Sequence, residues 1–263
     1  MVKLIASDLD GTIVNRDGTI SERTRAAFQA ARAAGIKIVF VTGRPFRWLD
    51  PISRAFSQLG TVICSNGALL YDLEQDEVIW SRTLPAATAR QARQIILDVE
   101  PGAVFGAETT RGLHLEAGFE RKPGAEAVPE LDLSTDALDA EGIVKFLARS
   151  NKLGIEQFYA AVAPALEPLL SITHSAFDMS LLEMAHVDIN KASTLGEYCR
   201  RLGIAPADVM AFGDMPNDLD MLEFAGHGYA MASGHELAIA AAKYTAPPLA
   251  EDGVAQVIEK LLA

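Results

Sequence analysis

Four short apolar segments of the chain each end in a cluster of small or acidic polar residues. They are Leu4–Ala6 before Asp8-Leu9-Asp10-Gly11-Thr12, Ile36–Val41 before Thr42-Gly43-Arg44, Thr61–Cys64 before Ser65-Asn66-Gly67, and Val209–Phe212 before Gly213-Asp214. Apolar runs of this length without a helical period are typical of buried strands. Ligands of open α/β sheets bind at the carboxyl ends of the strands, so the pattern predicts a site along one sheet edge.

Helix-length segments separate these predicted strands. Ser21–Gly35 has an N-capping serine, several alanines and a terminating glycine, and Trp48–Leu59 is amphipathic. Ala192–Leu202 and Gly253–Leu262 are also predicted helices. Alternating strands and helices predict an α/β fold with a parallel, Rossmann-like sheet and right-handed crossovers.

The alternation is lost in the middle of the chain. Residues 84–186 are expected to form a separate α+β domain inserted into a core made of residues 1–83 and 187–263. Within the insert the sequence predicts helices at Ala86–Val99 and Glu156–Leu169, a hairpin over Ala103–Phe119, a loop at Gly118–Asp139, a strand at Gly142–Leu147 and two short strands in Leu170–Glu183. The acidic run Asp72–Glu77 is expected to be a hairpin turn or a solvated loop.

Composition excludes several classes of protein. The chain has 263 residues, 49% of them hydrophobic, and a net charge of −12, which disfavours a nucleic-acid partner. It has no long apolar run to suggest a membrane span, and its start does not resemble a signal peptide. Cys64 and Cys199 lack metal-ligand spacing, so both are expected to be packing residues in a reducing cytoplasm. We therefore expect a cytoplasmic monomer or homodimer.

The acidic residues at the predicted sheet edge allow two interpretations. Asp-Gly after an apolar run is also a common hairpin turn. Asp8 and Asp10, however, are separated by one residue, so in an extended segment both side chains point the same way. Asp214, Asn217 and Asp218 follow a second predicted strand. A carboxylate cluster without His or Cys favours a hard cation with oxygen ligands, Mg²⁺ above all.

With such a cation, the predicted edge becomes a receptor for a phosphate group. Thr42 and the amide of Gly43 can donate hydrogen bonds to phosphate oxygens, and Lys191 can neutralise the remaining charge. Phosphoryl transfer needs mainly positioning and charge stabilisation, which these groups supply.

Each of these residues also has an ordinary structural interpretation. Taken alone, Lys191 is expected to be a solvated surface lysine, and Asp218 to be an acid that favours the start of a helix. Arg44 and Asn66 are as compatible with capping or sheet-edge hydrogen bonds as with substrate contact. Phe46 and Trp48 are expected to pack in the core rather than to line a substrate mouth.

The ordered motifs resemble those of the haloacid dehalogenase superfamily. Asp8-Leu9-Asp10-Gly11-Thr12, Thr42-Gly43-Arg44, Lys191 and Gly213-Asp214-Met215-Pro216-Asn217-Asp218 are similar to its four motifs. The size and position of the insert resemble the type IIB cap of the Cof-like sugar-phosphatase branch. Ser65-Asn66-Gly67-Ala68 and Glu251-Asp252-Gly253-Val254-Ala255 also resemble that branch.

This resemblance implies a role for each matching residue. Asp8 would be the nucleophile that forms an aspartyl-phosphate, and Asp10 would protonate the leaving oxygen and later activate water. Asp8, the backbone carbonyl of Asp10 and Asp214 would bind Mg²⁺. Thr42, Gly43, Lys191 and Asn217 would hold the phosphate, and Asp218 would orient Lys191 or support the metal ligands.

The sequence therefore predicts a Mg²⁺-dependent phosphatase acting on a small phosphorylated metabolite such as a sugar phosphate, with the insert closing over the substrate. A phosphomutase would have the same nucleophile and metal site, and release of free phosphate separates the two. A phospho-acceptor protein without turnover, or a pure binding module, would also use acidic groups at strand ends. Asp10 and the large insert argue against the phospho-acceptor protein, and the intact set of acidic residues argues against the binding module.

Overall fold

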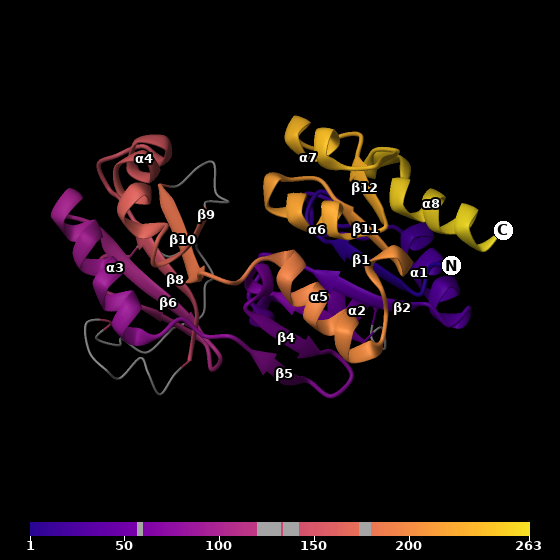
Figure 1. The fold of residues 1–263 in the computed structure, drawn as a ribbon, viewed down its shortest axis with the longest axis horizontal. Helices are drawn as coiled ribbons and strands as arrows, with labels where there is room; N and C mark the ends of the chain where they lie inside the picture. The colour runs from indigo at the N-terminus through magenta and orange to yellow at the C-terminus, as the bar shows by residue number, and fades with distance from the viewer. Residues whose placement is uncertain (57–59, 120–132, 134–141, 174–179) are drawn as a thin grey trace. The chain divides into compact units, whose positions relative to one another are not determined.

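The computed structural model describes residues 1–56, 60–119, 133, 142–173 and 180–263, and divides the chain into two compact units (Figure 1). One unit contains Met1–Trp80 together with Asn190–Ala263, and the other contains Ser81–Ile189. The first unit is thus built from both ends of the chain. The predicted loop at Gly118–Asp139 lies almost entirely outside the described residues, as does the segment 174–179.

The first unit, called the core here, contains an eight-stranded sheet of order β13-β12-β11-β1-β2-β3-β4-β5. Six strands run parallel, and β4 returns antiparallel to β3. In chain order the strands are β1 (Leu4–Asp8), β2 (Lys37–Val41), β3 (Thr61–Cys64), β4 (Leu69–Asp72), β5 (Glu77–Ser81), β11 (Val209–Gly213), β12 (His227–Met231) and β13 (Tyr244–Ala246). The predicted parallel sheet is confirmed, and the acidic run forms the turn between β4 and β5.

Helices cover both faces of the core sheet. They are α1 (Glu22–Ala33), α2 (Asp50–Ala55), α5 (Lys191–Leu202), α6 (Leu219–Phe224), α7 (Glu236–Ala241) and α8 (Gly253–Leu262). Side chains of α5, α6 and α7 pack with Leu4 and Ala6 of β1 on one face. On the other face, Phe28 of α1 packs against Phe40 of β2, with ring centroids 5.4 Å apart. Because strand side chains alternate between faces, β1 and β2 are buried from both sides.

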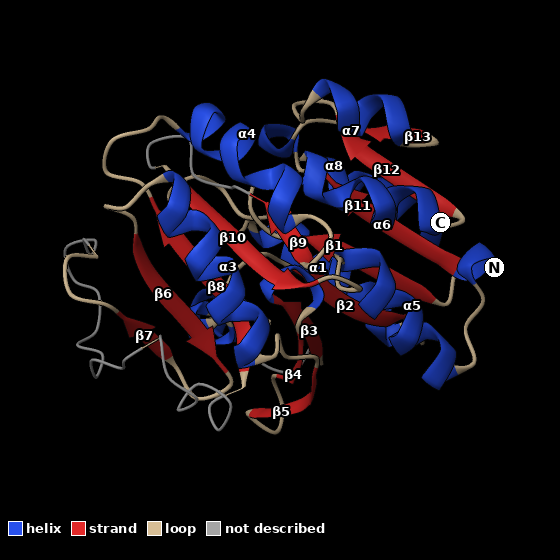
Figure 2. Cartoon of the chain, turned by 60° about the vertical axis from the view of Figure 1, so that its left-hand side comes forward, coloured by secondary structure: helices blue, strands red, loops and turns tan. Residues whose placement is uncertain are grey.

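The inserted unit is an antiparallel sheet with two helices on one face (Figure 2). Its strand order is β7-β6-β8-β10-β9. The elements are α3 (Ala86–Val99), β6 (Val104–Thr109), β7 (Leu113–Leu115), β8 (Ile143–Arg149), α4 (Ile155–Leu166), β9 (Leu170–Thr173) and β10 (Leu181–His186). Phe105, Phe146 and Phe158 form the centre of its apolar core. Lys145 and Glu183 form a largely buried ion pair of 2.8 Å across β8 and β10.

Three local features differ from the sequence predictions. The helix expected at Trp48–Leu59 is shorter: a 3₁₀ turn over Phe46–Trp48 precedes α2, which has Pro51 in its first turn, where a missing N–H costs no helical hydrogen bond. Trp48 was expected to be packed but is 53% exposed, with the guanidinium of Arg47 4.8 Å from its ring centroid. The pair α7 and β13 was not foreseen.

None of the helices in the described part of the chain combines the length and the apolar composition needed to cross a bilayer.

Candidate active site

The sheet order brings the predicted site residues to one edge of the core. Strands β11, β1, β2 and β3 are direct neighbours and parallel, so their carboxyl ends meet at the same edge. The ends of these strands and the segments that follow them carry Asp214 to Asp218, Asp8 to Thr12, Thr42 to Arg44 and Ser65 to Gly67, respectively. Segments about two hundred residues apart in sequence therefore lie side by side.

A buried ion-paired group of Lys191, Asp8 and Asp218 lies at this edge. The Nζ of Lys191 donates to Oδ1 of Asp8 and to Oδ1 of Asp218, each at 2.6 Å. The side chain of Lys191 is 1% exposed and that of Asp8 8%. The surface position expected for Lys191 alone is thus wrong, because two carboxylates accompany the ammonium group into the protein.

Asp218 holds this group to the segment after β11. Its Oδ2 accepts hydrogen bonds from the backbone N–H groups of Asp214 and Met215, at 3.1 and 3.0 Å, and its Oδ1 faces Lys191. The side chain is fully buried. The same carboxylate therefore caps the turn after β11 and contacts the lysine, while it makes no side-chain capping hydrogen bond to α6.

Lys191 is fixed because the start of α5 is fixed. Asn190 and Ser193 form a reciprocal capping box, in which the Asn190 side chain accepts from the Ser193 N–H at 2.7 Å. The hydroxyl of Thr194 donates to the carbonyl of Gly67 at 2.6 Å. Gly67 has φ 113°, and a Cβ at this position would collide with the carbonyl of Asn190. The turn after β3 thus packs directly against the helix that carries Lys191.

Burial decides the protonation of the group. Desolvation raises the pKa of Asp8 well above its usual value; the Lys191 charge opposes this shift, and the Asp218 and Asp214 charges add to it. Desolvation acts to lower the pKa of Lys191, but the charges of Asp218 and Asp8 outweigh it and raise the pKa, so the lysine stays protonated. Desolvation, followed by the charge of Asp218, raises the pKa of Asp214 to about 6.

Asp8, Asp214 and Asp218 are the group in the described chain whose carboxylate oxygens fit a metal ion, with one oxygen of each within 4.8 Å of the others. Three carboxylates beside one ammonium group leave an excess of negative charge, which a divalent cation would relieve. All of the donors are hard oxygens, as Mg²⁺ prefers. The residues present therefore fit the expected ion.

Asp214 is placed by two residues of the first motif. The hydroxyl of Thr12 donates to Oδ1 of Asp214 at 3.2 Å. Gly11 has φ 86°, and a Cβ there would collide with the Asp214 carboxylate. Glycine both allows the turn and lets the two loops approach. No role was predicted for Thr12 from the sequence, although it lies in the same motif as Asp8 and Asp10.

The predicted phosphate-binding groups line the neighbouring loops. Thr42 is buried, and its Oγ1 accepts the N–H of Arg44 at 3.0 Å, which leaves its hydrogen to donate to a ligand. Asn217 donates from Nδ2 to Oδ1 of Asn66 at 3.3 Å. Asn66 is in the left-handed region with φ 56°, and a Cβ on Gly43 would lie 3.1 Å from its Oδ1. Asn66 thus contacts the predicted phosphate ligand Asn217.

Asp10 and Arg44 form a second ion pair, in a more exposed position. Arg44 donates from Nε to Oδ2 of Asp10 at 2.8 Å and from Nη2 to Oδ1 at 2.5 Å. The exposed fraction of the side chain is 56% for Asp10 and 20% for Arg44. The Asp10 carboxylate does not belong to the buried metal-fitting group. Sequence spacing cannot reveal such a pairing between two loops.

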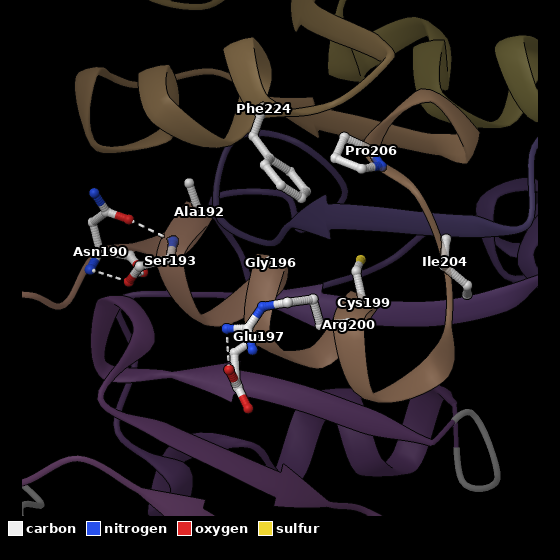
Figure 3. Close-up of a pocket in the computed structure, with 10 residues that line it drawn as sticks. All are labelled: Asn190, Ala192, Ser193, Gly196, Glu197, Cys199, Arg200, Ile204, Pro206 and Phe224. Carbon is white, nitrogen blue, oxygen red and sulfur yellow. Dashed lines mark hydrogen bonds and ion pairs between the residues drawn. The ribbon is translucent and has the colours of Figure 1, made fainter.

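A hollow of about 510 Å³ also opens on the core, beside α5 and α6 (Figure 3). Gly196, Cys199 and Phe224 are among the described residues that line it, and none of the predicted site residues is among them. Cys199 is buried there, and desolvation raises the pKa of its thiol to about 11, as fits an inert packing residue.

Comparison with known proteins identifies the family of the chain. A family model of the haloacid dehalogenase-like hydrolases matches residues 5–258. The phosphatase YitU of Bacillus subtilis, which acts on 5-amino-6-(5-phospho-D-ribitylamino)uracil, is 26% identical over 98% of this chain and 96% of its own. The pyridoxal phosphate phosphatase YbhA of Escherichia coli is 26% identical over 97% of each chain.

A solved structure has a similar fold. The HAD subclass IIB sugar phosphatase BT4131 superposes with a TM-score of 0.82 at 24% identity, covering 99% of each chain. The chain belongs to the haloacid dehalogenase-like hydrolases, as its ordered motifs predicted, and the superposition confirms the predicted fold of an α/β core with an inserted α+β domain. It is a phosphoric monoester hydrolase, the class to which its named relatives belong.

Proposed function

We propose that the protein is a Mg²⁺-dependent phosphatase that hydrolyses a small phosphomonoester, such as a sugar phosphate or a related metabolite, through an aspartyl-phosphate on Asp8. The observation that supports this most directly is the buried Lys191, which donates to both Asp8 and Asp218 at 2.6 Å. A buried cation beside a carboxylate nucleophile attracts a dianionic phosphate and holds the nucleophile in place.

The metal site would consist of Asp8, the backbone carbonyl of Asp10 and Asp214. Bound there, Mg²⁺ would offset the repulsion between the carboxylates and the phosphate. Asp218 lies in the same buried group, but both of its oxygens accept hydrogen bonds from Lys191 or the backbone. We therefore assign Asp218 to the support of Lys191.

The proposed reaction has two steps, phosphoryl transfer to Asp8 and hydrolysis of the aspartyl-phosphate. A carboxylate oxygen of Asp8 attacks phosphorus, the bond from phosphorus to the leaving oxygen breaks, and Asp10 gives that oxygen a proton. Asp10 then takes a proton from water as the water oxygen bonds to phosphorus and the bond to Asp8 breaks. The Thr42 hydroxyl, the Gly43 amide, Lys191 and Asn217 hold the phosphoryl oxygens throughout.

The substrates of the relatives indicate the class of substrate that we propose. The relatives YitU and YbhA are named for phosphates of a ribityl chain and of pyridoxal, and BT4131 for sugar phosphates. All three substrate classes are small phosphorylated metabolites. We propose that residues 84–186 act as a cap that selects among such leaving groups, and that the protein works in the cytoplasm as a monomer or homodimer.

The test is phosphate release from a panel of phosphorylated sugars, nucleotides and cofactors, with Mg²⁺ and with chelator. We expect metal-dependent release that falls by at least about a thousandfold in Asp8→Asn. Asp50→Asn is the matched control, because Asp50 is 80% exposed in α2 and should leave activity unchanged. Metal-independent release, or release that survives Asp8→Asn, would contradict the proposal, and isomerised substrate without free phosphate would indicate a mutase.

A further inference from the structure

Arg44 holds the carboxylate of Asp10 through a bidentate contact. Two N–H groups of one guanidinium meet the two oxygens of one carboxylate, at 2.8 and 2.5 Å. A bidentate contact of this kind sets the plane of the carboxylate as well as its distance. Asp10 follows β1 in a turn and is 56% exposed, so without a partner its side chain would sample several rotamers.

Arg44 is itself anchored on both sides of its Cα. Its backbone N–H donates to the Thr42 hydroxyl at 3.0 Å, and its carbonyl accepts from the Ser65 N–H at 3.0 Å. The guanidinium therefore extends from a fixed point toward Asp10. Through this residue the proposed acid and base is connected to the loop that carries the phosphate ligand Thr42.

Stability alone is a poor explanation for this pair. Ion pairs with this degree of solvent contact contribute little to the stability of the fold. Proton transfer, in contrast, requires the acid to lie within hydrogen-bond reach of the leaving oxygen, and small misplacements are costly in rate. The geometry thus matches the needs of the reaction better than the needs of the fold.

We propose that Arg44 is a positioning residue that orients the side chain of Asp10, which as the carboxylic acid gives its proton to the leaving oxygen and as the carboxylate then takes a proton from water. The inference rests on the proposed phosphatase function. The sequence also allowed a direct contact between Arg44 and substrate. In the structure, two N–H groups of Arg44 donate to Asp10 instead.

Leaving groups of different basicity provide the test. p-Nitrophenyl phosphate releases a stabilised anion that needs little protonation, whereas glycerol phosphate releases an alkoxide that needs a proton. The ratio kcat/KM reports the steps up to departure of the leaving group. We expect Arg44→Ala to lower kcat/KM by about 10- to 100-fold for glycerol phosphate, and by less than about threefold for p-nitrophenyl phosphate.

Two variants separate positioning from other roles. Arg44→Lys keeps the charge without the bidentate fork and should recover only part of the loss. Arg54→Ala is the matched control, since Arg54 pairs with Asp50 on the surface of α2 at 3.5 Å and should leave both substrates unaffected.

A double-mutant cycle with Asp10→Ala completes the test. If Arg44 acts through Asp10, Arg44→Ala has no further effect on glycerol phosphate once Asp10 is removed. Equal losses on both substrates, or an unchanged loss in the Asp10→Ala background, would show substrate binding and overturn the inference. A gain in activity would show that Arg44 restrains Asp10 and would also overturn it. A wild-type protein that hydrolyses neither substrate would instead contradict the proposed function.

Discussion

Two ion-paired groups lie at the same sheet edge of the core, and they differ mainly in their exposure to solvent. Lys191, Asp8 and Asp218 are buried, and the lysine occupies the first position of α5, where the helix dipole disfavours a cation. Arg44 and Asp10 are partly solvated, with exposed fractions of 20% and 56%. Forming the buried group therefore requires a large desolvation free energy, and removing one of its members is expected to destabilise the fold strongly. Neither holds for the solvated pair.

This difference separates two kinds of functional charge. Removing one member of a buried group leaves an uncompensated charge in a medium of low polarity, so fold and function depend on the same contacts. Removing one member of a solvated pair leaves a charge that water can stabilise. Variants at the two places should therefore separate loss of stability from loss of orientation.

Lys191→Met is expected to have the largest effect. It leaves the Asp8 and Asp218 carboxylates buried without their ammonium partner, so we expect a loss of about 3–5 kcal/mol in the free energy of unfolding, together with loss of activity. Urea denaturation measures the first and phosphate release the second. The control is Lys3→Met, because Lys3 forms its 2.7 Å pair with Asp208 at the surface, where its side chain is 59% exposed. Equal destabilisation by the two changes would show that the buried ion-paired group supports the fold no more than a surface pair does.

The effect of Mg²⁺ on stability should depend on pH. In the metal-free fold the pKa of Asp214 is raised to about 6 from its usual 3.8, so the folded state binds this proton more tightly than the unfolded chain. Stability from this source is present at low pH and is lost as pH rises from about 4 to about 6. Because Mg²⁺ competes with protons for the same carboxylates, its addition should raise Tm more at about pH 7.5 than at about pH 5.

The measurement is thermal unfolding at both pH values, with Mg²⁺ and with chelator. Asp214→Asn is the informative variant, because it removes both the titrating group and the proposed ligand. A gain in Tm that is the same at both pH values, or that persists in Asp214→Asn, would contradict the assignment of the ion to this site.

Arg44→Ala should have the smallest effect on the fold. The pair is partly solvated, so we expect a change of less than about 1 kcal/mol in the free energy of unfolding, despite the loss of activity on poor leaving groups. The same urea denaturation as for Lys191→Met provides the comparison. A loss comparable to that of Lys191→Met would mean that Arg44 supports the structure of the loop rather than the orientation of Asp10.

The sequence was sufficient to predict those parts of the fold that repeat a strong local pattern. The apolar runs ending in polar clusters gave the central parallel strands, and the cap and stop residues of α1, Ser21 and Gly35, marked that helix closely. The missed elements α7 and β13 are short, with six and three residues, so they offer little periodicity. Trp48 was misjudged because a large aromatic ring favours burial, whereas its exposure depends on the path of the 3₁₀ turn Phe46–Trp48 that carries it.

For the site, the sequence indicated which residues lie close together, but not which side chains form ion pairs or hydrogen bonds with one another. Asp8, Lys191 and Asp218 could be brought together by the sheet topology and the ordered motifs. The partner of Arg44 could not, since Arg44 and Asp10 are 34 residues apart and their contact depends on side-chain conformation. Thr12 likewise gains its role only from the approach of the loop that carries Asp214.

The arrangement of the core sheet also has a consequence for synthesis on the ribosome. Strand β1 pairs with β2 on one side and with β11 on the other, and β11 begins at Val209. The unit Ser81–Ile189 is synthesised completely before that residue is made. One edge of β1 therefore lacks its partner strand during most of translation. The nascent chain must keep this apolar edge from pairing with other chains until β11, in the last fifth of the sequence, has been made.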